Sequence, residues 1–164
     1  MEFILGDMMR HSVLQTELRK NRPFDTAEEE ALLNLVRTAE VAAVPFERLF
    51  GEQGISGPQY NVLRILRGQG GRGLPCHEIS AQMVSRMPDM TRLVDRLEGA
   101  GFVQRCRTSD DRRVVLICIT EEGLALLKRL DTPLRALHKQ VVGHMTRTEL
   151  AELSRLLVKA RMPP

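Results

Sequence analysis

Cysteine is scarce in this chain, and the spacing of its cysteines excludes most of their usual roles. The 164 residues hold only Cys76, Cys106 and Cys118, with no C-x-x-C or Cys/His pattern for a metal. The four histidines form no i, i+4 pair, and no serine has a Gly-x-Ser-x-Gly setting. We therefore expect reduced and inert thiols, no catalytic residue, no enzyme activity, no metal and no cofactor. A reactive Cys76 near a helix N-terminus is the alternative.

Long apolar runs are also absent. No segment approaches the roughly 18 apolar residues that a membrane span needs. The start, Met-Glu-Phe-Ile-Leu-Gly-Asp, has an early acid and too short an apolar run for a signal peptide. We expect a cytoplasmic protein that does not bind a membrane.

The charge balance excludes little. Lys and Arg number 24 against 21 Asp and Glu, which gives a formal net charge of +3 and a pI of about 9.0. A mildly basic chain permits a polyanionic partner without requiring one. A hydrophobic content of 43% and a charged content of 27% are ordinary for one globular domain.

The stretch from Met87 to Thr120 is the most informative part of the sequence. Its first half has an apolar stripe at helical period, formed by Met90, Leu93, Val94 and Leu97. The other face carries Thr91, Arg92, Asp95 and Arg96. Because proline is tolerated only in a first turn, the helix is predicted to begin at about Pro88. Gly101 fits the left-handed residue after the helix end, with Phe102 contacting Leu97.

A hairpin follows this helix. Residues 103–107 and 114–119 are β-prone, and the second run is apolar on both faces, so we expect protein to cover both. Between them lies a polar loop, Thr-Ser-Asp-Asp-Arg-Arg, too long for a two-residue turn. Protruding loops of this kind often carry function.

The remaining residues predict helices. Asp25 or Thr26 caps a first long helix that Pro45 kinks and that Gly51 and Gly54 end. Capping boxes start at Ser56, for a helix over 60–67, and at Thr146, for the last helix. Thr120 caps a long helix that contains Pro133. A short helix over 75–84 lies only two residues before the helix at Met87, which is the spacing of a helix-turn-helix.

These motifs resemble the MarR family of winged-helix transcription regulators. The matching segments are Gln59-Tyr-Asn-Val-Leu-Arg-Ile-Leu66, Thr91-Arg-Leu-Val-Asp-Arg-Leu-Glu98 with Gly101-Phe-Val103, and Asp111-Arg-Arg-Val114 leading to Ile119-Thr120 and Gly123. Together they cover roughly residues 26–160. The resemblance implies a homodimer whose first and last helices interlace, a palindromic DNA operator, and release by a small phenolic or anionic molecule. Family members that sense peroxides use a cysteine near the N-terminus, which this chain lacks.

The predicted fold is α+β and mostly helical. A winged helix-turn-helix DNA-binding lobe over 56–120 is flanked by dimerisation helices over 25–55 and 121–164, after an N-terminal arm over 1–24. Together, residues 25–164 form a single MarR-like domain. The predicted function is that of a sequence-specific, double-stranded DNA-binding transcriptional regulator, most simply a repressor. The alternative is a winged-helix module that binds another protein with the same exposed helix.

The DNA-binding candidates lie on the reading helix, just before it, and on the wing. They are Arg86, Pro88, Thr91, Arg92, Asp95, Arg96, Asp111, Arg112 and Arg113. By resemblance Arg113 enters a minor groove, which attracts arginine when narrow, and Asp111 holds that side chain or the loop. The candidates for a ligand pocket are Phe46, Phe50, Tyr60 and Arg86.

Purely structural roles for these residues stay open as alternatives. Arg92 and Arg96 could form only a solvated salt-bridged surface with Asp89 and Asp95. Asp95 would repel phosphate, so it either orients an arginine or accepts from cytosine N4. Arg112 and Arg113 could simply flank a strand.

Overall fold

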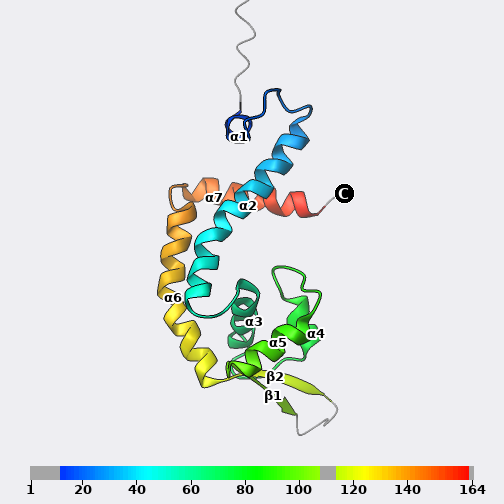
Figure 1. Cartoon of the computed structure of the whole chain (residues 1–164), viewed down its shortest axis with the longest axis vertical. Helices are drawn as coiled ribbons and strands as arrows, with labels where there is room; N and C mark the ends of the chain where they lie inside the picture. Colours follow the sequence, from blue (N-terminus) through cyan, green and yellow to red (C-terminus); the bar gives the residue numbers. More distant parts are fainter. Residues whose placement is uncertain (1–11, 108–113, 163–164) are drawn as a thin grey trace, which may run out of the picture. The chain divides into compact units, whose positions relative to one another are not determined.

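The structure is a computed structural model that describes residues 12–107 and 114–162. Helices dominate it, with one small antiparallel sheet (Figure 1). The elements in chain order are α1 (Val13–Glu17), α2 (Ala27–Glu52), α3 (Gly57–Arg67), α4 (Cys76–Ala81), α5 (Met90–Gly99), β1 (Val103–Arg107), β2 (Val115–Ile119), α6 (Glu121–Val142) and α7 (Arg147–Arg161). Within these residues no helix is both long and apolar enough to cross a membrane.

The chain forms two compact units that meet within α2, one ending at Val44 and the other beginning at Pro45. In the first unit Ser12 caps α1, whose Leu14 is buried, and Arg37 of α2 pairs with Glu17. Helix α1 lies within the predicted N-terminal arm. The predicted division into arm, dimerisation helices and lobe stays a prediction.

Side-chain caps fix the start of most helices in the second unit. Ser56 and Thr146 form the two predicted capping boxes, with Gln59 and Glu149 as their reciprocal partners. Thr120 caps α6 by accepting from the Gly123 N–H at 3.1 Å. Each cap satisfies a backbone donor that the first helical turn leaves free. In the first unit Thr26, one of the two predicted candidates, caps α2 by accepting from the Glu29 N–H.

Several predicted helix bounds are wrong. The helix expected at about Pro88 begins at Met90, because the Asp89 side chain accepts from the Arg92 N–H at 2.9 Å and makes Asp89 the cap. The helix expected over 75–84 covers only Cys76–Ala81, since Gln82 already closes it with a bond to the Ile79 carbonyl. The first long helix passes Gly51 and ends at Glu52.

The core of the second unit lies between α3, α4, α5, α6 and the sheet. Its fully buried side chains are Val62, Leu63 and Leu66 of α3, Ile79 of α4, Val94 and Leu97 of α5, Ile117 of β2, and Leu126, Leu127 and Leu130 of α6. Burial of a side chain of this size contributes about 1.5–3 kcal/mol. At the edge of this core Arg67 of α3 donates to both carboxylate oxygens of Asp131 on α6, at 2.9 and 3.0 Å.

The sheet is a two-stranded antiparallel pair, with Val103 opposite Ile119 and Arg107 opposite Val115. Leu74, just before α4, adds a bridge to Ile117 on the other edge of β2. The expectation that protein covers both faces of the second strand is wrong for its outer end. Ile117 is 1% exposed, but Val115 is 42% exposed, because the strand extends beyond the helices that pack on its inner end.

Candidate nucleic-acid interface

The helix α5 is held by one face and leaves the other to solvent. Leu93, Val94 and Leu97 are 7%, 0% and 0% exposed. The opposite face carries Thr91, Arg92, Asp95 and Arg96, all of which are exposed. The structure therefore brings these four predicted site residues onto one surface, as the helical period required.

A left-handed glycine ends α5 and directs the chain into the wing. Gly101 has φ +76°, and its N–H donates to the Glu98 carbonyl at 2.9 Å. The Phe102 N–H donates to the Leu97 carbonyl at 2.9 Å. These two bonds form a Schellman motif, which confirms the predicted cap and fixes where β1 starts relative to α5.

The residue after β2, Thr120, is hydrogen-bonded to the same turn at Gly101 and Phe102. The Thr120 hydroxyl donates to the Gly101 carbonyl at 2.7 Å, and the Thr120 N–H donates to the Phe102 carbonyl at 3.1 Å. A side chain at Gly123 would clash with that Phe102 carbonyl. The wing, the end of α5 and the start of α6 are thus joined closely, so the wing is positioned by backbone contacts.

An ion-pair cluster ties the wing to the exposed face of α5. Arg105 of β1 donates to Asp95 at 2.6 Å and also to Glu98. Glu98 additionally accepts from the Arg105 backbone N–H at 3.0 Å. The hydrogen bond that Arg105 donates to Asp95 is the largest influence that raises the pKa of Arg105 above its ordinary value, so the guanidinium stays charged.

This cluster bears on the two predicted roles of Asp95. The structure supplies the arginine that Asp95 orients, although the side chain is still 55% exposed on the reading face. The sequence analysis did not single out Arg105 or Glu98 as site residues. A signal was available: strand alternation puts Arg105 on the same face as the buried Val103, where a charged side chain needs a partner.

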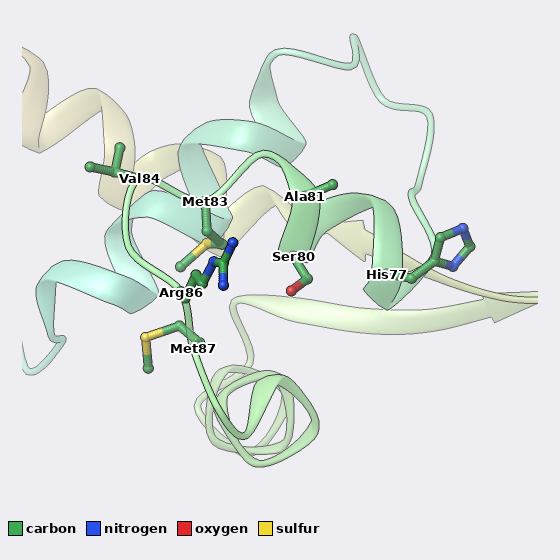
Figure 2. Close-up of a pocket in the computed structure, with 7 residues that line it drawn as sticks. All are labelled: His77, Ser80, Ala81, Met83, Val84, Arg86 and Met87. Carbon is green, nitrogen blue, oxygen red and sulfur yellow. The ribbon is translucent and has the colours of Figure 1, made fainter. Parts of the chain in front are cut away.

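The segment between α4 and α5 carries two further candidates, Arg86 and Pro88, both exposed. Arg86 lines a pocket of about 670 Å³ in the helix-turn-helix, to which α4 and the segment after it both contribute (Figure 2). The lining residues are His77, Ser80 and Ala81 of α4, then Met83, Val84, Arg86 and Met87. This lining mixes a cation, hydroxyl and imidazole groups with apolar surface.

The predicted ligand-pocket residues do not gather around this opening. Phe50 stacks on Tyr60 with ring centroids 4.7 Å apart, and Phe46 lies 5.5 Å from the His138 ring. Phe50 is a core residue at 6% exposed, and burial is the largest influence that raises the pKa of Tyr60. Arg86 lines a pocket that none of these aromatic side chains lines. The four-residue ligand pocket stays a prediction.

The wing-loop candidates Asp111, Arg112 and Arg113 lie outside the described residues. The structure describes the two strands that lead to them, ending at Arg107 and resuming at Val114. Their predicted roles stay predictions.

Comparison with known proteins agrees with this geometry. Residues 55–115, from just before α3 to the start of β2, match the MarR family. Among solved structures, the chain is similar to a MarR transcription factor from Planctomyces limnophilus. The two are 40% identical with a TM-score of 0.64, over 82% of this chain and 98% of that one.

Two further relatives extend the comparison. The homoprotocatechuate degradative operon repressor of Escherichia coli is 25% identical over 123 residues, which are 75% of this chain and 82% of the repressor. The fold is shared with BpsR of Bordetella bronchiseptica, at 20% identity and a TM-score of 0.72, over 87% of this chain and all of that one. The DNA binding of BpsR is regulated by 6-hydroxynicotinic acid. The helix-turn-helix packs its apolar face in the core and exposes arginines on α5, with the wing beside it. The chain belongs to the MarR family and is a DNA-binding transcriptional regulator.

Proposed function

We propose that this chain binds a palindromic duplex operator as a homodimer and represses transcription, with α5 reading bases in the major groove. One observation supports this most directly: Leu93, Val94 and Leu97 fix α5 in the core and leave Arg92 and Arg96 exposed beside the wing. A helix fits the major groove, where arginine can bind guanine through two hydrogen bonds. The competing protein-binding module gains no comparable support, because the matched relatives are transcriptional regulators.

The two arginines are proposed to have different roles. Arg92 lies in the first turn of α5, near the helix N-terminus that helix-turn-helix proteins point at the bases. Arg96 lies one turn later, in the last turn of α5, where it contacts phosphate. A base contact specifies sequence, whereas a phosphate contact positions the protein on any duplex.

The test compares Arg92→Ala and Arg96→Ala on a selected cognate duplex and on a scrambled one, at one ionic strength. Arg92→Ala should lose about 1–3 kcal/mol on the cognate duplex and less on the scrambled one. Arg96→Ala should weaken both alike. Arg155→Ala, which removes an exposed arginine of α7, controls for charge and should leave both affinities nearly unchanged. Equal losses on both duplexes for Arg92→Ala would contradict the reading role.

The wing contributes a second contact in this proposal. Arg113 enters the minor groove, with Asp111 holding it and Arg112 contacting the backbone nearby. Arg113→Ala should weaken binding and reduce the slope of log affinity against log salt by about one for each wing that loses a contact. An unchanged slope would assign Arg113 a structural role.

The homodimer is supported by apolar surface on the first and last helices. On α2, Leu32 is 61% and Val36 52% exposed, and on α7 Leu156 is 47% exposed. No residue of α7 is buried among those the structure describes. A helix with an apolar stripe and no buried residue needs a partner surface, and a second copy provides one. Two copies would place their α5 helices about 34 Å apart, one turn of DNA.

Sedimentation at micromolar concentration tests the dimer. The wild type should be a dimer, whereas Leu153→Glu with Leu157→Glu should give monomers or insoluble protein. Ser154→Glu is the control, because it adds a negative charge at an exposed polar position of α7. A stable monomeric wild type would contradict the proposed assembly.

A small anionic or phenolic effector completes the proposal. Its support is the fold shared with BpsR, whose DNA binding 6-hydroxynicotinic acid regulates, and the cation and apolar groups around Arg86. Benzoate and phenol are suitable first probes of operator release. Release by benzoate that Arg86→Ala abolishes would support a role for that arginine. Release that the substitution leaves unchanged would place the effector elsewhere.

A further inference from the structure

Two of the three cysteines lie together on the wing. In the register of the sheet, Cys118 is opposite Gln104 and Cys106 is opposite Leu116. Alternation along each strand therefore puts Cys106 and Cys118 on the same face, as diagonal neighbours. Both are free and partly exposed, and the adjacent Cys106 thiol is one of the influences that raise the pKa of Cys118. The sequence analysis expected reduced thiols, and the proximity of Cys106 and Cys118 follows from the strand register.

The backbone at Gly73 encloses one side of this pair. A Cβ added to Gly73 would lie 2.6 Å from the Cys118 sulfur and 2.9 Å from the Leu116 Cβ. No side chain fits between this segment and β2. The backbone that leads into Leu74 and α4 therefore lies against the Cys118 sulfur and limits the directions in which it can move.

We propose that Cys106 and Cys118 are the site of a reversible disulfide within one wing, formed by a peroxide, and that its formation lowers affinity for DNA. The expected loss of affinity rests on the proposed DNA-binding function, whereas the formation of the disulfide does not. It differs from cysteine sensing at an N-terminus, because both sulfurs belong to the strands that carry the wing loop.

The reaction balances with one peroxide. The Cys106 thiolate attacks a peroxide oxygen, the O–O bond breaks, and a sulfenic acid forms as hydroxide leaves and takes up a proton. The Cys118 sulfur then attacks the Cys106 sulfur, and the S–O bond breaks as water leaves. Two thiols and hydrogen peroxide give one disulfide and two waters, with sulfur oxidised and peroxide oxygen reduced.

The order of attack follows from burial. Burial, together with the adjacent Cys106 thiol, raises the pKa of Cys118 to about 11. Cys118 is therefore a protonated thiol at neutral pH, and the first attack is assigned to Cys106. Closure of the disulfide needs the Cys118 sulfur as nucleophile, so its rate should increase as the pH rises from 7 towards 9.

Closure of the bond must deform the wing. Diagonal neighbours in an antiparallel pair lie about 7–8 Å apart, whereas a disulfide joins Cα atoms about 4.4–6.8 Å apart. The two strands must therefore shift or twist towards each other. Arg105 is the residue next to Cys106 and is held by Asp95 and Glu98 of α5, so the shift strains the contact between wing and reading helix.

The experiment uses the full chain, reduced and then treated with excess hydrogen peroxide at pH 7 and pH 9. Free thiols, intact mass and peptide mapping report the disulfide, and titration of a selected duplex reports affinity. The wild type and Cys76→Ser should each lose two thiols and the mass of two hydrogens, faster at pH 9. Their affinity should fall by about fivefold or more, within the ordinary range of coupling between two sites, and return with dithiothreitol. Cys106→Ser and Cys118→Ser should form no intramolecular disulfide and keep their affinity.

Three results would overturn the proposal. One is the absence of a Cys106–Cys118 disulfide in the oxidised wild type. Another is a disulfide that leaves affinity unchanged. The last is a loss of affinity on peroxide treatment that is as large in the double variant Cys106→Ser with Cys118→Ser as in the wild type. If the reduced protein binds no selected duplex at all, the proposed function fails while the thiol and mass measurements still decide the disulfide.

Discussion

The ion-pair cluster of the wing makes the role of Asp95 measurable. Asp95 either positions Arg105 or accepts from a cytosine, and the two roles predict different couplings. We consider Asp95→Ala, Arg105→Ala and the double variant. The pair is only partly shielded, with the side chains 55% and 36% exposed. An ion pair this exposed stabilises the fold by about 0.2–1 kcal/mol, so each variant should unfold within roughly 4 °C of the wild type.

Binding to DNA separates the two roles. If Asp95 acts by positioning Arg105, its removal has little further effect once Arg105 is absent, and the double-mutant cycle shows a coupling close to the single effect. That coupling should be equal on cognate and scrambled duplexes. If Asp95 accepts from cytosine, its loss costs about 1–3 kcal/mol on the cognate duplex alone, whether or not Arg105 is present. We expect the first result.

The assay is fluorescence anisotropy with the four proteins and two labelled duplexes at fixed ionic strength. Removal of a carboxylate beside DNA also strengthens binding to any duplex, because it removes repulsion between like charges. The single effects of Asp95→Ala are therefore ambiguous, and the coupling energy is the deciding quantity. A zero coupling with a loss confined to the cognate duplex would refute the positioning role.

Three further predictions concern stability and can be checked by thermal unfolding. Gly123→Ala should destabilise the protein by about 1–3 kcal/mol, because its Cβ would clash with the Phe102 carbonyl. Gly99→Ala, with open space around it, should be neutral or stabilising by up to about 1 kcal/mol. Equal effects of the two substitutions would contradict the close contact between Gly123 and Phe102. Leu97→Ala should cost about 2–5 kcal/mol, since this side chain is fully buried, and a smaller loss would mean that α5 is not fixed by its apolar face. The pKa of Glu149 is lowered, first by the Thr146 backbone N–H, so its stabilisation is present above its ordinary pKa and is lost as pH falls. Glu149→Gln should then lower the melting temperature at pH 7, and by progressively less as the pH falls below the ordinary pKa. A difference that does not shrink with falling pH would contradict stabilisation by this carboxylate.

The sequence by itself determined the local structure of this protein. Period 3.6 in Leu93, Val94 and Leu97 determined which face of α5 is buried, and Gly101 determined where the helix ends. The caps at Ser56, Thr120 and Thr146 follow from side chains that accept from the backbone a few residues away. The order of these motifs along the chain was enough to indicate the family.

Helix bounds depended on competition that the sequence pattern did not resolve. Pro88 and Asp89 both suit a helix start, and the Asp89 cap prevailed because its carboxylate accepts from the Arg92 N–H. At α4 the apolar pattern continued to Val84, but the helix ends at Ala81 with Gln82 as its C-cap, and Met83 and Val84 line the pocket.

Tertiary structure alone decided which distant side chains meet. Arg105 reaches Asp95 and Glu98 because a glycine turn folds β1 back along α5, and Cys106 meets Cys118 because of the strand register. Phe50 stacks on Tyr60 and contributes to the core. Hydrophobic period and capping act over a few residues, so they can be found by inspection of the chain. Contacts between residues that are seven or more positions apart depend on how the elements pack, and that depends on the whole core at once.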